Sequence, residues 1–250
     1  MNGLRTAALN SWFYSLLVIY TMLVVPALAL WVAVQAPFIS HRLALRLFRR
    51  AIRWYGFPII YALPRPWIRV RYEAAGAVAL PSPCLVVCNH RSSSDPFLMA
   101  CLPLPEVVQI VNIWIKRLPV WGIMAQWAGY LSVREMTPEE FQERAGKLLR
   151  EGVSLVAFPE GTRARDRFLG PFHGTVFRLA LRERVPIVPV CISGHERMPP
   201  RGSVILRPGE VRVRSLPPVP WMEYRDLTPF QLKNRIRARI QEELDMMEAA

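Results

Sequence analysis

Two residues with the chemistry of a general base, His90 and Asp95, stand five positions apart in the stretch Cys88–Pro96. This stretch follows the apolar run Leu85–Val87, which predicts a buried strand, and it leads into an expected helix that opens at Pro96. A turn can bring the carboxylate to one imidazole nitrogen, which fixes the tautomer and leaves the other nitrogen to take a proton from an alcohol. The pattern therefore predicts a catalytic base. A structural alternative stays open, because Asp-Pro is also typical of a helix start.

A second group of reactive residues lies in the stretch Phe158–Arg163, which follows the apolar run Val153–Ala157. It places a carboxylate, a glycine, a hydroxyl and a guanidinium at the end of another expected strand. In an open α/β sheet the strand ends along one edge form the ligand crevice. Gly161 lets backbone amides approach a ligand closely, and Arg163 can bind phosphate through its planar guanidinium. We expect both stretches to contribute to one ligand site.

These stretches resemble sequence blocks of the glycerophospholipid acyltransferases, the family typified by 1-acylglycerol-3-phosphate acyltransferase. Four blocks occur in the family's order and extend from Arg69 to Gly194. Two positions depart from the family pattern: Ser93 stands where many members carry a bulky aromatic residue, and His173 stands where lysine is most common. The matching positions are Asn89, His90 and Asp95 in the first block, Lys116, Pro119, Gly122 and Arg134 in the second, Phe158–Arg163 in the third and Val185–Val190 in the fourth.

The resemblance implies an O-acyltransferase that moves a fatty acyl chain from a thioester to the free sn-2 hydroxyl of lysophosphatidic acid, giving phosphatidic acid. In this reaction His90 is the general base and Asp95 orients it. Cations bind the phosphate of the acceptor, with Arg163 as the first candidate. The resemblance implies no cofactor, and the cosubstrate is acyl-CoA or acyl-carrier protein. The full set of expected substrate-binding residues is Glu160, Gly161, Thr162, Arg163, Lys116 and Arg134.

Three alternatives to these assignments stay open. The acceptor can be a different lysolipid, such as a lyso-ornithine lipid, which has no phosphate for Arg163 and Lys116 to bind. The chain can also be a non-catalytic membrane protein that binds lipid. The apolar run Val185–Val190 can be an ordinary core strand or a wall of the acyl pocket. No Gly-x-Ser-x-Gly motif is present, so an acyl-serine intermediate of the α/β-hydrolase type is not indicated.

The composition favours a lipid partner over a nucleic acid. The 250 residues carry a formal net charge of +13, and 52% of them are hydrophobic. Motifs that read bases are absent, and the apolar N-terminus instead favours anionic lipid as the partner of the positive charge. The four cysteines lack the paired spacing of a metal site, so we predict buried, reduced thiols and no metal.

Residues 1–40 are expected to form a membrane segment. No charged residue occurs from Thr6 to Ser40, which is longer than the roughly 20 residues that span a bilayer. Aromatic residues in this stretch suit membrane interfaces. Pro26 either kinks one spanning helix or divides the stretch into a helical hairpin.

Residues 41–62 are expected to form a basic amphipathic helix that lies on the membrane surface. Arginines recur at helical spacing at positions 42, 46, 49 and 53, beside a neighbouring apolar face. The alternative is the solvated face of an ordinary helix. Because only Arg5 precedes the apolar segment and many arginines follow it, the catalytic domain is predicted on the cytoplasmic face of the inner membrane.

Residues 63–250 are predicted to form one α/β catalytic domain, for which the resemblance implies a mixed, mostly parallel sheet flanked by helices. Capping signals at Thr137 and Thr228 predict two helix starts, each with proline at the first helical position. The predicted strands are 67–73, 84–89, 106–111, 130–134, 153–158 and 186–192, followed by a possible hairpin of 203–207 and 210–216 across Pro208-Gly209.

Overall fold

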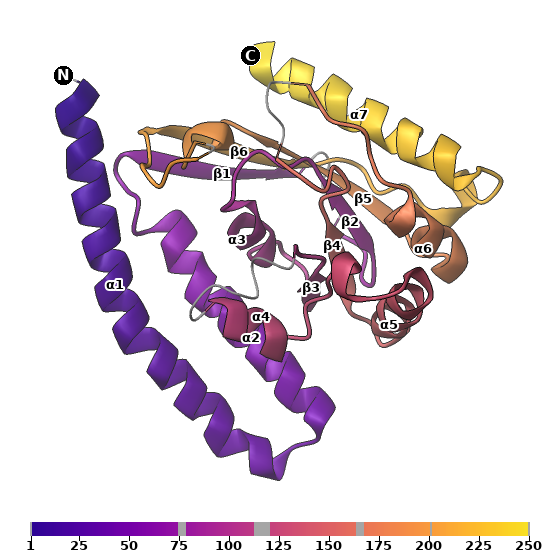
Figure 1. The fold of residues 1–250 in the computed structure, drawn as a ribbon, viewed down its shortest axis with the longest axis horizontal. Coiled ribbons are helices and arrows are strands. Elements are labelled where there is room, and N and C mark those ends of the chain that lie inside the picture. The colour runs from indigo at the N-terminus through magenta and orange to yellow at the C-terminus, as the bar shows by residue number, and fades with distance from the viewer. Residues whose placement is uncertain (1, 75–78, 113–120, 164–167, 201, 250) are drawn as a thin grey trace.

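The computed structural model describes residues 2–74, 79–112, 121–163, 168–200 and 202–249. Its helices and strands alternate along the chain after an N-terminal pair of helices (Figure 1). The α-helices are α1 (Asn2–Gln35), α2 (His41–Tyr61), α3 (Asp95–Ala100), α4 (Trp121–Trp127), α5 (Pro138–Arg150), α6 (Thr175–Glu183) and α7 (Pro229–Ala249). The strands are β1 (Ile68–Ala74), β2 (Leu85–Cys88), β3 (Val107–Gln109), β4 (Ser154–Ala157), β5 (Ile187–Ser193) and β6 (Gly209–Ser215).

The six strands form one sheet in the order β1-β6-β5-β2-β4-β3. The strand pairs β2–β4, β2–β5, β3–β4 and β1–β6 are parallel, and only β5–β6 is antiparallel within the described sheet. The strands β2, β3, β4 and β5 therefore all run in one direction, and their carboxyl ends lie along one edge. The predicted α/β class with a mixed, mostly parallel sheet is confirmed.

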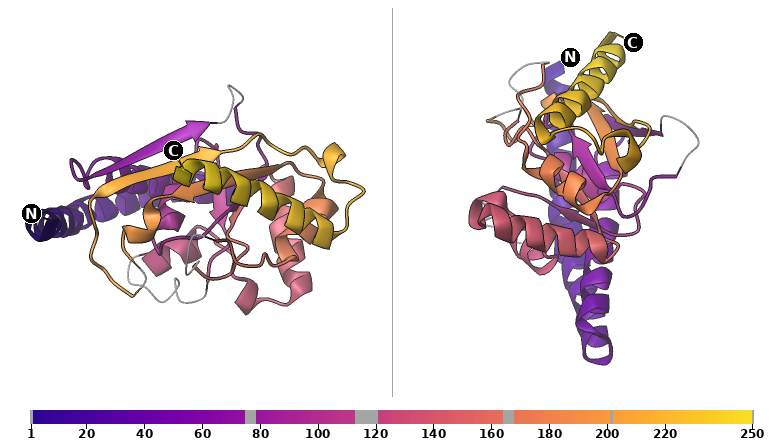
Figure 2. Two further views of the ribbon diagram at one scale, coloured as in Figure 1. Left: turned by 90° about the horizontal axis from the view of Figure 1, so that it is seen from above. Right: turned by 90° about the vertical axis from the view of Figure 1, so that its right-hand side faces the viewer.

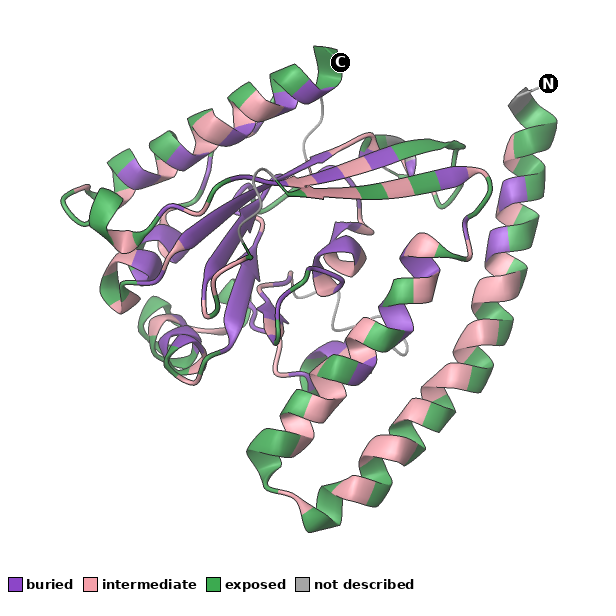
Figure 3. Cartoon of the chain, turned by 180° about the vertical axis from the view of Figure 1, so that it is seen from behind, coloured by how far each residue is buried: buried purple, intermediate pink, exposed green. Residues whose placement is uncertain are grey.

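The central strands are buried on both faces. Successive residues of a strand point to opposite faces of the sheet, so Leu85 and Val87 join one hydrophobic core while Val86 and Cys88 join the other. The first core packs against α5, α6 and α7, and the second packs against α2, α3 and the N-terminal part of α1. Figure 3 shows this pattern as buried strands between partly exposed helices. The site at the strand ends therefore rests on a rigid two-sided core.

The N-terminal segment is one continuous helix, α1, with Pro26 inside it. The structure therefore does not show the alternative in which Pro26 divides residues 1–40 into two helices. By length and composition, residues Gly3–Phe38 contain a helix long and apolar enough to cross a membrane. The joined ends of α1 and α2 project beyond the sheet and its covering helices (Figures 1 and 2).

The arginines of α2 bind groups in the α/β part of the chain. Arg49, whose side chain is 7% exposed, pairs with Glu106, and Arg46 joins the same carboxylate at 3.1 Å. The predicted amphipathic helix is present, but this row of arginines bonds to protein groups, so its place on a lipid surface stays a prediction. The other contacts are Arg42 to the carbonyl of Glu151 at 2.5 Å, Arg49 to that of Ala128 at 2.8 Å and Arg53 to that of Leu104 at 3.0 Å.

Two predicted strands are wrong. Residues 130–134 make only an isolated bridge between Leu131 and Ile110 before a 3₁₀ turn begins at Val133. Residues 203–207 do not form a hairpin with β6, because β1 and β5 already occupy both edges of β6. Their backbone binds α1 instead: Asn10 donates to the carbonyl of Leu206 and accepts from its amide, each at 2.8 Å.

The helix starts and the cysteines agree with the sequence predictions. Thr137 forms a capping box with Glu140 at the start of α5. At the start of α7, the Thr228 hydroxyl accepts from the amide of Gln231 at 3.2 Å. The four cysteines, Cys84, Cys88, Cys101 and Cys191, are buried and unpaired.

Candidate active site

The candidate site lies at the edge where the carboxyl ends of β2, β3, β4 and β5 meet, as expected for ligand sites in such sheets. His90 follows β2, and the stretch Phe158–Arg163 follows β4. Asn89 holds the ends of two strands together, since its amide group donates to the carbonyl of Ile192 at 2.9 Å and accepts from the amide of Ile192 at 2.7 Å. The sheet thus brings the two predicted stretches to one place.

The predicted contact between the base and its carboxylate is present. The Nδ1 atom of His90 lies 2.8 Å from Oδ2 of Asp95, whose side chain is fully buried. The same oxygen accepts from the backbone amides of Arg91 at 2.6 Å and Ser92 at 2.8 Å. These two amides belong to the turn between β2 and α3, so the turn itself holds the carboxylate toward the imidazole.

A second histidine, His195, binds the other oxygen of the same carboxylate. Its Nδ1 lies 2.5 Å from Oδ1 of Asp95, and the side chain is 6% exposed. His195 was not singled out from the sequence. It follows β5 on the same edge as His90, so examining every strand end along that edge would have found it.

The environment keeps Asp95 ionised. Burial raises the pKa of its carboxyl group, but the hydrogen bonds and charges of His195 and His90 outweigh that effect and lower the pKa to about 2. An ionised carboxylate accepts hydrogen bonds from Nδ1–H, which leaves Nε2 of His90 with its lone pair. That nitrogen has no hydrogen-bond partner among the described residues, and the imidazole lines the pocket.

Glu160 supports the site through the backbone. Its Oε1 atom accepts from the amide of His90 at 2.9 Å, and Oε2 accepts from the amide of Gly170 at 3.0 Å. The residue is 5% exposed and lies outside the pocket lining. Burial raises the pKa of its carboxyl group, against the lowering effect of the two amides. Substrate contact by Glu160 stays a prediction, because both of its oxygens bind amides of the protein.

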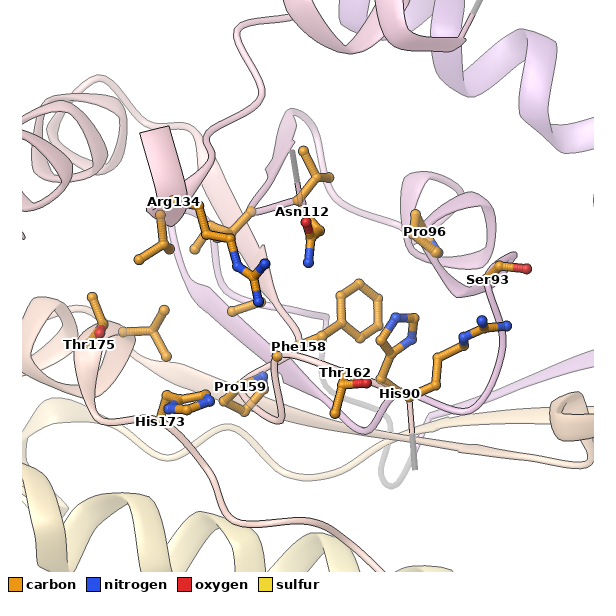
Figure 4. A pocket seen from close by; sticks show the side chains of 17 residues that line it. His90, Ser93, Pro96, Asn112, Arg134, Phe158, Pro159, Thr162, His173 and Thr175 are labelled. Carbon is orange, nitrogen blue, oxygen red and sulfur yellow. The ribbon is translucent and has the colours of Figure 1, made fainter. Parts of the chain in front are cut away.

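A pocket of about 500 Å³ opens beside His90. In Figure 4 the imidazole of His90 and the guanidinium of Arg134 point into it, and Phe158 stacks obliquely on His90 with ring centroids 4.7 Å apart. Its lining is partly apolar and partly basic. The apolar lining consists of Pro96, Ile110, Val111, Val133, Ala157, Phe158, Pro159 and Val176, and the basic lining consists of Arg134, Arg163 and His173.

The pocket brings together most of the predicted substrate-binding residues. Gly161, Thr162, Arg163 and Arg134 all line it. Neither guanidinium has an acidic partner among the described residues. Lys116 lies outside the described residues. The run from Val185 to Val190 belongs to the core around β5 and does not line the pocket.

Gly161 holds a conformation that requires glycine. Its φ angle is 67°, in the left-handed region, and a Cβ atom there would lie 3.2 Å from the ring of His173. The two positions that depart from the family pattern, Ser93 and His173, both line the pocket. The departures therefore fall where they can affect substrate choice. Within the described ranges, no group of three or more His, Cys, Asp or Glu side chains is arranged to hold a metal ion.

The comparisons with known proteins agree with this geometry. The protein-family model described as "Acyltransferase" matches residues 69–193, which is half of the chain. This chain belongs to the acyltransferase family. The matched range contains both stretches that form the site, the one after β2 and the one after β4, and it extends to the end of β5. The matched range therefore includes His90 and Asp95 as well as Arg134 and Arg163.

Individual acyltransferases resemble the chain to different extents. The chloroplastic 1-acyl-sn-glycerol-3-phosphate acyltransferase BAT2 of Brassica napus is 33% identical over 172 residues, which cover 66% of this chain and 49% of that protein. The human 1-acyl-sn-glycerol-3-phosphate acyltransferase alpha is 35% identical over 162 residues, covering 60% of this chain and 56% of that protein. The chain thus spans about half the length of these two curated relatives.

A solved structure shares the whole fold. The crystal structure of the 1-acyl-sn-glycerophosphate (LPA) acyltransferase PlsC from Thermotoga maritima matches 100% of this acyltransferase and 99% of that chain, with a TM-score of 0.78. The sequence identity is 19%. The match therefore extends the shared fold to the N-terminal helices, which the family model does not cover.

Proposed function

We propose that this acyltransferase transfers a fatty acyl chain from acyl-CoA or acyl-carrier protein to the sn-2 hydroxyl of lysophosphatidic acid, giving phosphatidic acid. The observation that carries the proposal is the position of His90. Asp95 holds its Nδ1 atom at 2.8 Å, and its imidazole lines a pocket whose lining includes Arg134 and Arg163. A base and two guanidiniums in one pocket suit an acceptor that carries both a hydroxyl and a phosphate.

The reaction follows from this geometry. Nε2 of His90 removes the proton of the acceptor hydroxyl as the oxygen attacks the thioester carbonyl carbon. The new carbon–oxygen bond forms, the carbon–sulfur bond breaks, and the sulfur leaves as a thiol after it takes the proton back from Nε2. The buried carboxylate of Asp95 stabilises the imidazolium that exists between these two proton transfers.

The lining of the pocket matches the two parts of the substrates. Arg134 and Arg163 both line the pocket and can bind phosphate oxygens. The apolar lining is suited to acyl chains. Names of the relatives support this acceptor, since both curated relatives described above are 1-acyl-sn-glycerol-3-phosphate acyltransferases.

We also place the enzyme at the cytoplasmic face of the inner membrane. The apolar helix α1 is long enough to span a bilayer. Only Arg5 precedes its apolar run, and the arginines of α2 follow it. Both the lysolipid acceptor and the two-chain product are membrane lipids. An anchor beside the catalytic domain keeps the pocket close to its acceptor.

The proposal is tested by acyl transfer in detergent. The purified full chain receives lysophosphatidic acid or lyso-ornithine lipid, each with acyl-CoA or acyl-carrier protein, next to a His90→Ala variant. We expect phosphatidic acid from lysophosphatidic acid with the wild-type chain and none with the variant. Product only from lyso-ornithine lipid would keep the base and overturn the phosphate acceptor. A fully active His90→Ala variant would overturn the mechanism.

Phosphate binding is tested by Arg163→Ala, with Arg225→Ala as the matched control. Arg225 is a partly exposed arginine that pairs with Asp226 and lies outside the pocket. Loss of one charge-assisted contact should raise the KM for lysophosphatidic acid by about tenfold in Arg163→Ala and leave the control unchanged. Unaltered KM and kcat in Arg163→Ala would remove this residue from the acceptor site.

A further inference from the structure

His195 makes two contacts that connect it to the base without placing it in the pocket. Its Nδ1 lies 2.5 Å from Oδ1 of Asp95, and its Nε2 lies 3.0 Å from the hydroxyl oxygen of Ser94. The pocket lining does not include it. We propose that His195 is a positioning residue for the acyl-transfer reaction, which acts on His90 by locking the carboxylate of Asp95.

The two oxygens of Asp95 are held differently. Oδ2 accepts from His90 and from the amides of Arg91 and Ser92, whereas the contact of Oδ1 is His195. The side chain of Asp95 is fully buried, so an oxygen that loses its donor cannot bind bulk water instead. Without His195, rotation of the carboxylate toward another donor weakens the bond to His90.

The distal side of His195 is also fixed. The Ser94 hydroxyl that contacts Nε2 lies 2.8 Å from the carbonyl of Met198 and 3.0 Å from the hydroxyl of Ser92. Both serines belong to the turn that carries the catalytic pair. The imidazole is therefore held at both nitrogens, and its orientation relative to Asp95 is set by the same turn that sets His90.

The backbone before His195 is built for this position. Gly194 has a φ angle of 80°, and a Cβ atom at this residue would collide with the carbonyl oxygen of Glu210 at the start of β6. Only glycine fits there without a backbone shift. The tight turn after β5 then directs His195 back toward α3. A local arrangement of this kind is more than an ordinary buried histidine requires.

This inference rests on the proposed function, and it predicts a specific kinetic signature. Because His195 touches Asp95 and not the pocket, its loss should lower kcat and leave KM for both substrates unchanged. An amide nitrogen can replace Nδ1–H as the donor to Oδ1, so an asparagine side chain should preserve most of the rate. A leucine side chain fills similar space without a donor.

The experiment compares His195→Leu, His195→Asn, Ser94→Ala and the control Tyr224→Phe. Tyr224 is buried between the 3₁₀ turn Trp221–Glu223 and α7, and its hydroxyl contacts the carbonyls of Ala180 and Val185, so its variant loses a buried hydrogen bond away from the site. We expect kcat to fall about tenfold in His195→Leu with unchanged KM, and about threefold in Ser94→Ala, since a charge-assisted hydrogen bond is stronger than a neutral one. His195→Asn and Tyr224→Phe should stay within about twofold of wild type.

A second readout needs no turnover. The ¹⁵N NMR shifts of the His90 ring should show the Nδ1–H tautomer in the wild type and in His195→Asn, and a mixture of tautomers in His195→Leu. Equal kcat in His195→Leu and wild type, a raised KM, or an unchanged His90 tautomer would each overturn the inference. If His195→Leu does not fold, a kcat in Ser94→Ala equal to wild type decides against it. A wild-type chain with no product would instead overturn the proposed function, and the NMR result would still test the contact.

Discussion

Replacement of Asp95 by asparagine separates the charge of the carboxylate from its hydrogen bonds. The Oδ2 position accepts three N–H donors, from His90, Arg91 and Ser92, so the single oxygen of the new amide must occupy it. The NH₂ group then faces Nδ1 of His195, which becomes an acceptor when its proton moves to Nε2. The Ser94 hydroxyl can accept a hydrogen bond from that Nε2–H and donate to the carbonyl of Met198 at 2.8 Å. The contacts of His90, Arg91, Ser92 and His195 with this side chain can therefore all remain.

The expected loss of rate follows from the charge alone. The pKa of Asp95 is held at about 2, below its ordinary value of 3.8, although burial acts in the opposite direction. At 1.36 kcal/mol per pKa unit, this difference corresponds to roughly 2 kcal/mol of favourable interaction with the ionised form. His195 and His90 share this interaction, so if it stabilises the imidazolium of His90 in the transition state, its loss lowers kcat by up to roughly 30- to 100-fold.

The assay is release of free thiol from acyl-CoA in the presence of saturating lysophosphatidic acid, with Asp226→Asn as the control. Asp226 is 87% exposed and lies outside the pocket, so its variant should keep the wild-type rate. The KM of Asp95→Asn should stay unchanged, because the carboxylate does not line the pocket. A kcat within threefold of wild type, or a loss confined to KM, would refute the reasoning.

Three further variants or conditions test the parts around this pair. Gly161→Ala should lower the melting temperature by about 2–4 °C per kcal/mol of strain, measured by thermal unfolding, because its φ angle is 67° and the new Cβ meets His173. Glu160→Gln should lower kcat about tenfold, because one of its two amide contacts, at His90 or Gly170, would face an NH₂ group; an unchanged rate would show that the backbone contact is dispensable. The pKa of Asp95 in the folded state lies below its unfolded value, so this group stabilises the fold above pH 4 and loses that contribution as the pH falls toward about 2. The free energy of unfolding of the wild type and of Asp95→Asn, measured over this pH range, tests the expectation.

The core strands were predictable because burial on both faces leaves a clear sequence signal. The run Leu85–Val87 and the run Val153–Ala157, which is apolar except for Ser154, became β2 and β4, with boundaries within two residues. Strands covered by helices on both faces select apolar residues at every position. The polar residues directly after them were then predicted to share one edge, and the structure brings His90 and Arg163 to a single pocket.

The two wrong strands show what local sequence does not contain. The residues around Leu131 and Leu206 have suitable side chains, but a strand also needs a free partner edge. In the first case a 3₁₀ turn at Val133 ends the pairing after one bridge. In the second case β1 and β5 take both edges of β6, and Asn10 of α1 pairs with the backbone of Leu206. Which segment pairs with a strand edge therefore depends on all the strands of the sheet, and the local sequence of one segment does not determine it.

The arginines of α2 show a similar limit. Their helical spacing predicted a basic face, which is present. Spacing alone does not indicate whether that face contacts lipid, solvent or protein. Arg46 and Arg49 share Glu106, which lies just before β3 and is nearly buried. A buried carboxylate that receives two guanidiniums ties α2 to the domain more firmly than an exposed pair would. The helix therefore ties the apolar α1 to the sheet at the amino end of β3, on the opposite side from the strand ends that carry the pocket.

Two buried carboxylates, Asp95 and Glu160, hold the proposed base His90 from different sides, and their environments act on them in opposite ways. Asp95 faces two imidazoles, so its pKa falls and its charge is available to His90 as the ring takes up a proton. Glu160 faces two backbone amides, which offset only part of the cost of burial, so its pKa rises. Asp95 acts on the imidazole ring, whereas Glu160 acts on the backbone that carries it. Charge and position are thus supplied by separate groups, and variants of the two should differ: loss of the Asp95 charge should change the pH dependence of kcat, and loss of the Glu160 contact should lower kcat at every pH.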